Sequence, residues 1–107
     1  MIDPSLYKIR LTPLALRRLT DISDVHDRTL VGDRLHRLKK EPETQGKPLI
    51  GKLFGYRSVR TDNHCHRIIY RLEHQTIVVV MVEREQHNGR ARTGIHAMLA
   101  HAIIKCC

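Results

Sequence analysis

Hydrophobic and polar residues alternate over residues 7–11, which is the pattern of a strand with one buried face. Thr12 and Pro13 then predict the start of a helix, because a threonine hydroxyl can cap free amides and a proline fits the first helical position. Apolar residues recur at helical spacing behind them, at Ala15, Leu19 and Ile22. The chain is therefore expected to begin with a strand and a short amphipathic helix.

A second helix is predicted over residues 23–40, beginning at a Ser-Asp cap. Its buried stripe is expected to be Val31, Leu35 and Leu38. Pro42 prevents the helix from continuing. Residues 41–48 are rich in Pro and Gly, so they are interpreted as a loop.

Three strand-like segments follow, over residues 53–60, 66–72 and 76–82, and the gaps between them are short enough for hairpin turns. The last segment is apolar on both faces, which predicts a central strand covered on both sides. Residues 94–105 have the spacing of a terminal amphipathic helix. The predicted fold is α+β, in the order β-α-α-β-β-β-α, with residues 1–107 as one domain. Two N-terminal helices are expected to pack on one face of a small, mostly antiparallel sheet, and the other face is where Arg and Lys can converge.

The chain is strongly basic: 19 Lys+Arg against 11 Asp+Glu give a formal net charge of +8. The excess is concentrated in residues 44–72, with a single acid, and in residues 86–107, with none. This distribution favours a polyanionic partner, and because only 4% of the residues are aromatic, contact with nucleic acid should depend on charge rather than on base stacking. No signal peptide or membrane-spanning run is recognisable, so a cytoplasmic protein without a membrane partner is expected.

Five short segments, taken in their order along the chain, indicate a family resemblance. They are Thr-Pro-Leu-Ala-Leu at 12–16, Leu-Lys-Lys-Glu-Pro at 38–42, Gly-Lys-Pro-Leu-Ile-Gly-Lys-Leu at 46–53, Gly-Tyr-Arg-Ser-Val-Arg at 55–60 and His-Arg-Ile-Ile-Tyr at 66–70. In this order and spacing, residues 7–87 resemble the RelE/ParE superfamily of bacterial toxin–antitoxin toxins. The resemblance implies a cytosolic toxin, of the kind linked to plasmid stabilization, that a cognate antitoxin protein holds inactive. For RelE-like members it implies an mRNA interferase, a hydrolase that cuts mRNA on the ribosome.

The sequence departs from the family pattern near the predicted site. His66 stands where members commonly have a tyrosine. After the last strand, either Arg84 or His87 occupies the family's basic position, and His96 stands where the family has a tyrosine.

RNA cleavage without a metal requires a 2′-hydroxyl to attack the adjacent phosphorus, which builds negative charge on the phosphate oxygens. Arginine suits that charge because its guanidinium group binds two oxygens and stays protonated. Arg57, Arg60 and Arg67, on adjacent predicted strands, are expected to form one cluster, and His87 or His96 is expected to move protons. The predicted catalytic residues are Arg60, Arg67, Arg84, His87 and His96, and the predicted RNA contacts are Lys47, Lys52, Arg57, Arg71 and Arg90.

Neither a cofactor nor a metal is expected. His64 and His66 would point to the same side of a strand, but no third and fourth ligand stands at a recognisable spacing. Tyr70 is interpreted as a packed sheet residue.

Two other functions stay open. A ParE-like module would poison DNA gyrase by protein binding, with no nuclease chemistry. An inactive relative would retain only antitoxin binding.

Overall fold

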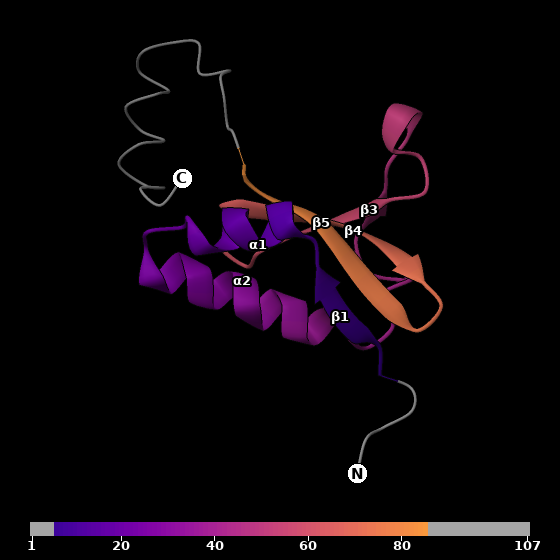
Figure 1. Cartoon of the computed structure of the whole chain (residues 1–107), viewed down its shortest axis with the longest axis horizontal. Helices are drawn as coiled ribbons and strands as arrows, with labels where there is room; N and C mark the ends of the chain where they lie inside the picture. The colour runs from indigo at the N-terminus through magenta and orange to yellow at the C-terminus, as the bar shows by residue number, and fades with distance from the viewer. Residues whose placement is uncertain (1–5, 86–107) are drawn as a thin grey trace.

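Five strands form one sheet, in the order β1-β5-β4-β3-β2, in the computed structural model, which describes residues 6–85 (Figure 1). The strands are β1 (Lys8–Leu11), β2 (Lys47–Pro48), β3 (Arg57–Arg60), β4 (His66–Glu73) and β5 (Thr76–Arg84). β1 runs parallel to β5, and the other neighbouring pairs are antiparallel. β5 lies between β1 and β4, and its residues Ile77, Val78 and Val79 are fully buried, so the expected interior strand is confirmed.

Two helices, α1 (Pro13–Thr20) and α2 (Val25–Leu38), occupy the predicted positions and lie beside each other (Figure 1). Thr12 Oγ1 accepts a hydrogen bond from the Ala15 amide at 3.2 Å. Asp24 caps α2 in the same way, since its Oδ1 accepts from the Asp27 amide at 3.1 Å. Each cap satisfies an amide that the first helical turn leaves without a partner.

The hydrophobic core lies between these helices and one face of the sheet. Its buried members are Ala15, Val31, Leu35 and Leu38 from the helices and Val59, Ile68, Tyr70, Ile77, Val79 and Val82 from the strands. The predicted stripe of α2 is therefore confirmed, and both helices cover the same face.

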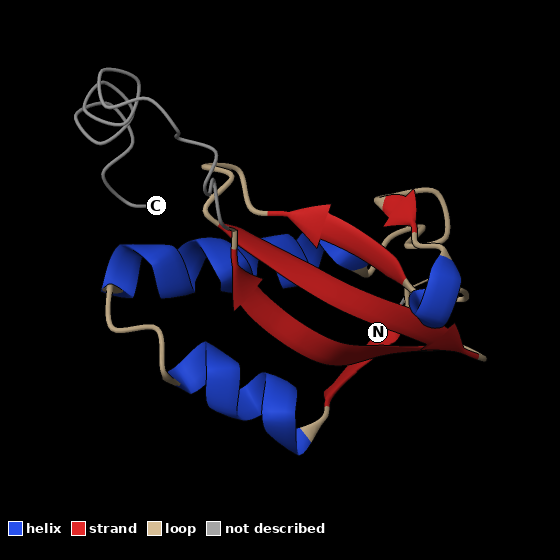
Figure 2. Cartoon of the chain, turned by 90° about the horizontal axis from the view of Figure 1, so that it is seen from above, coloured by secondary structure: helices blue, strands red, loops and turns tan. Residues whose placement is uncertain are grey.

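The segment before β3 differs from the prediction. Strand structure was expected from residue 53, but Gly51–Leu53 is a 3-10 turn, η1, and β3 begins only at Arg57. Gly51 and Gly55 have φ values of +69° and +98°, which interrupt an extended strand. Residues 47–48, expected in a loop, form β2 and pair with β3. Figure 2 shows η1 at the end of the molecule opposite to the α1–α2 connection.

The hydroxyl group of Tyr70 anchors the loop before β2. The Tyr70 hydroxyl lies 2.8 Å from the carbonyl oxygen of Pro42 and 2.9 Å from that of Gln45. Burial raises the pKa of Tyr70, so the hydroxyl stays protonated and can donate. Tyr70 is fully buried, as the interpretation of a packed sheet residue requires.

The predicted terminal helix over residues 94–105 lies outside the described residues. Among residues 6–85, neither helix has the length and apolar character that crossing a membrane requires.

Candidate functional site

Arg60 and Arg67 lie opposite each other across β3 and β4, and Glu83 lies opposite Arg67 on β5. Opposed residues of antiparallel strands project from the same face of a sheet. Val59 and Ile68, their neighbours in sequence, belong to the core beneath the helices. Arg60, Arg67 and Glu83 therefore project from the face that α1 and α2 leave uncovered.

Two glutamates pair with these arginines. Arg67 donates to Oε2 of Glu83 from Nη2 at 2.7 Å and from Nε at 3.2 Å. Arg60 Nη2 lies 3.2 Å from Oε2 of Glu85, and Arg67 Nε lies 3.8 Å from Oε1 of the same residue. We call Arg60, Arg67, Glu83 and Glu85 the arginine–glutamate cluster. The hydrogen bond that Arg67 donates to Glu83 is the main cause that raises the pKa of Arg67, so its guanidinium group stays cationic.

The cluster is a candidate oxyanion site. Guanidinium groups bind carboxylates and phosphates through the same forked geometry, so the carboxylate of Glu85 marks a position that a phosphate can take. The side chain of Arg60 is 52% exposed and that of Arg67 is 36% exposed, so both are accessible. A phosphate can therefore approach both guanidinium groups from solvent and compete with the carboxylate for them.

Arg57 does not join this cluster, so that part of the sequence prediction is wrong. Three positions separate Arg57 from Arg60, and the alternation along a strand places them on opposite faces. Arg57 donates from Nε to the Gln45 carbonyl at 3.0 Å and from Nη2 to the Gly46 carbonyl at 3.2 Å. In the structure its guanidinium group holds the loop before β2, and its RNA contact stays a prediction.

Three other predicted RNA contacts lie apart from the cluster. Lys47 and Lys52 are exposed and precede β3, whereas Arg60 is its last residue. Arg71 is paired with Glu73, its Nη2 lying 2.6 Å from the carboxylate, and its guanidinium carbon is 5.9 Å from the centre of the Tyr56 ring. Lys47 lies opposite Ser58, two residues before Arg60 on β3, so it projects from the same face as Arg60. The RNA contacts of these three cations stay predictions.

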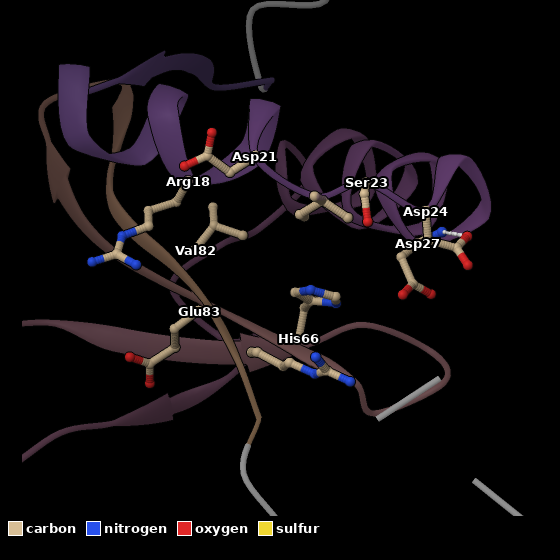
Figure 3. Close-up of a pocket in the computed structure, with 10 residues that line it drawn as sticks. Arg18, Asp21, Ser23, Asp24, Asp27, His66, Val82 and Glu83 are labelled. Atoms are coloured by element: carbon tan, nitrogen blue, oxygen red, sulfur yellow. Dashed lines mark hydrogen bonds between the residues drawn. The ribbon is translucent and has the colours of Figure 1, made fainter. Parts of the chain in front are cut away.

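Arg84 projects from the opposite face to Glu83 and Glu85, because it lies between them on β5. It lies opposite His66 and lines a pocket of about 630 Å³ beneath the α1–α2 connection (Figure 3). The structure therefore does not bring Arg84 together with Arg60 and Arg67. Its predicted catalytic role would require a site on the helix-covered face.

His66 points from β4 toward the helices, between Val82 and Asp27 (Figure 3). Only 7% of His66 is exposed, and its Nδ1 has no hydrogen-bond partner. Burial is the main cause that lowers the pKa of His66, and the nearby Arg84 lowers it further, while Asp27 opposes both. The imidazole is therefore held neutral inside the fold.

Three predicted site residues, His87, Arg90 and His96, lie outside the described residues. Within residues 6–85 no group of three His, Cys, Asp or Glu side chains is arranged to hold a metal ion.

The sequence prediction missed both glutamates of the cluster. Their spacing in the sequence could have indicated that they act together, because Glu83 and Glu85 are two residues apart at the end of a strand and therefore share a face. The pairing of β4 with β5 that puts this face beside Arg67 could not be read from that spacing.

Solved structures resemble this chain in fold and, in one case, in sequence. The structure of the toxin–antitoxin complex RelBE2 from Mycobacterium tuberculosis contains a chain that is 30% identical, with a TM-score of 0.67, and the match covers 75% of this chain and 99% of that one. This chain belongs to the RelE/ParE toxin superfamily. The isolated RelE toxin of E. coli has a TM-score of 0.66 at 14% identity, over 91% of this chain and 98% of that one.

The ParE branch of the superfamily resembles the chain equally well in fold. A chain of the ParDE system of P. aeruginosa has a TM-score of 0.65 at 12% identity, over 77% of this chain and 99% of that one. No protein-family model and no curated protein matches the sequence. The likeness establishes the superfamily, and it leaves both the RelE and the ParE activities open.

Proposed function

We propose that this chain is the toxin of a toxin–antitoxin pair and that it is an endoribonuclease cleaving mRNA on the ribosome. Membership of the superfamily supports the toxin role, with a cognate antitoxin as partner and the cytoplasm as location. The observation that carries the nuclease proposal is the convergence of Arg60 and Arg67 on the single carboxylate of Glu85, at 3.2 and 3.8 Å. Two guanidinium groups that both lie within 4 Å of one carboxylate are suited to a scissile phosphate.

In the proposed reaction a phosphate of the mRNA replaces the carboxylate between the two guanidinium groups. The adjacent 2′-hydroxyl attacks phosphorus, and Arg60 and Arg67 stabilise the charge that develops on the phosphate oxygens. The chemistry needs no metal, because the guanidinium groups supply the fixed positive charge. His87 or His96 is expected to protonate the leaving 5′-oxygen.

Arg67→Ala tests this proposal. Expression of the wild-type chain should stop growth and leave mRNA with new ends, mapped by primer extension after a brief pulse. Arg67→Ala should abolish both effects while circular dichroism shows an intact fold. Arg17→Ala is the matched control, because Arg17 is an exposed arginine on α1, and it should remain toxic. Toxicity retained by Arg67→Ala would rule out the role of Arg67.

One observation favours the gyrase alternative. The two positive and two negative charges of the arginine–glutamate cluster cancel, so its arginines are already occupied by carboxylates. A module that acts only by binding a protein does not need arginines that are free to bind phosphate. Such a protein would induce DNA-damage signalling while mRNA stays intact. An inactive relative would show neither effect but would still bind its antitoxin tightly.

A further inference from the structure

The proposed nuclease reaction requires a group that removes the proton from the attacking 2′-hydroxyl. A general base must lie within hydrogen-bond reach of that proton. His66 cannot serve at the arginine pair, because it lies on the helix-covered face. Among the described residues, Glu83 and Glu85 are the ionisable acceptors in contact with the pair.

The two glutamates differ in their partners. Oε2 of Glu83 accepts two hydrogen bonds from Arg67, which fixes the guanidinium group in place. Oε1 of Glu85 is buried and has no hydrogen-bond partner, and the nearest nitrogen of Arg67 is 3.8 Å away. Glu85 therefore retains a free acceptor oxygen beside both cations.

The backbone of Glu85 is fixed beside the cluster. Its backbone amide donates to the Cys65 carbonyl at 2.8 Å, which ties the end of β5 to the start of β4. Its side chain is 16% exposed, the smallest fraction in the cluster. A buried carboxylate oxygen without a donor is unfavourable for folding, so stability does not account for this arrangement.

We infer that Glu85 is the general base of the reaction, an inference that rests on the proposed nuclease function. When a phosphate binds Arg60 and Arg67, the carboxylate of Glu85 is released from Arg60 and stays next to the phosphate. It takes the proton of the 2′-hydroxyl as the 2′-oxygen bonds to phosphorus. The bond from phosphorus to the 5′-oxygen breaks, the 5′-oxygen keeps the electron pair and takes a proton from the general acid of the proposed reaction, and Glu85 and that acid later exchange their protons with water. The products are a 2′,3′-cyclic phosphate and a 5′-hydroxyl.

Glu85→Gln tests the assignment, because it keeps the shape of the side chain and removes its basicity. The assay uses the purified full chain with ribosomes carrying a short labelled mRNA, at several pH values. Glu85→Gln should slow cleavage by about 10²–10⁴-fold, with RNA binding unchanged or tighter and the melting temperature maintained. The wild-type rate should fall as the solution is acidified, and the residual rate of Glu85→Gln should lose that dependence.

Two further variants make the result specific. Glu73→Gln is the matched control, because Glu73 is also paired with an arginine, Arg71, but at the other end of β4. It should cleave at the wild-type rate. Glu85→Asp keeps a carboxylate on a shorter side chain and should cleave faster than Glu85→Gln.

The outcomes separate the two proposals. If the wild type cleaves mRNA and Glu85→Gln cleaves within about threefold of it or faster, the assignment of Glu85 is wrong and the nuclease proposal stands. A faster Glu85→Gln would instead mean that the carboxylate competes with the substrate phosphate. If the wild type cleaves no mRNA under any condition, both proposals fail.

Discussion

Gly46, directly before β2, lies close to β3, and replacing this residue tests the geometry that holds β3. A Cβ atom at Gly46 would lie 2.4 Å from the carbonyl oxygen of Ser58 and 2.7 Å from Cγ1 of Val59. Both contacts are shorter than van der Waals distances, and one of them is to backbone. Gly46 also has a φ of +71°, which a residue with a side chain adopts only with strain.

The cost of Gly46→Ala follows from these two effects. The left-handed backbone costs about 1–2 kcal/mol for a residue with a Cβ. Forcing a methyl group into packed surroundings costs about 1–3 kcal/mol more. We therefore expect the free energy of unfolding to fall by about 2–5 kcal/mol, a large part of the ~5–15 kcal/mol that stabilises a typical domain.

Two other glycines separate the contributions. Gly51 has a φ of +69° and Gly32 lies within α2, and a Cβ at either would meet no atom within 4 Å. Gly51→Ala should therefore cost only the backbone contribution of about 1–2 kcal/mol. Gly32→Ala should stabilise the protein by about 0.5–1 kcal/mol, because alanine favours a helix. Urea unfolding followed by circular dichroism gives all three values. Equal losses for Gly46→Ala and Gly51→Ala would refute the close approach of Gly46 to β3.

Three further variants test local features. Tyr70→Phe removes a buried hydroxyl that bonds two carbonyl groups and should cost about 1–3 kcal/mol in urea unfolding, and a loss under 0.3 kcal/mol would contradict those bonds. Because burial lowers the pKa of His66 below the ~6.5 of the unfolded chain, the unfolded state takes up a proton first, and the unfolding free energy should fall as the pH drops below about 6.5. His66→Gln should reduce that dependence in thermal melts at pH 7.5 to 5.5, and an identical pH profile would count against a neutral buried imidazole. The ion pair of Arg37 with Asp62, at 2.7 Å, has both side chains more than half exposed, so Asp62→Ala should change the unfolding free energy by less than about 1 kcal/mol.

Much of the fold could be predicted because its signals are local. Thr12 and Asp24 mark the starts of the two helices, and each makes the expected cap. The parallel pairing of β1 with β5 joins segments far apart in the chain, so no local sequence pattern predicts it. Residues 47–48 form a strand only because β3 provides a partner, so turn-rich composition predicted a loop there.

The site was predictable only in part, for the same reason. Arg60 and Arg67 were correctly placed together, because they flank the turn between two adjacent strands. Arg57 was assigned to the same cluster although the alternation along β3 already separates it from Arg60. The pairing of both arginines with Glu83 and Glu85 depends on tertiary structure, and the overall excess of positive charge concealed it.

The chemistry of mRNA ends after a brief pulse of expression shows whether Arg60 and Arg67 form a nuclease site. The wild type should produce fragments that end in 2′,3′-cyclic phosphate and begin with a 5′-hydroxyl, and the double variant with Arg60→Ala and Arg67→Ala should produce none above the uninduced level. Intact mRNA with the wild type, or the same fragments with the double variant, would contradict a nuclease site at these two arginines.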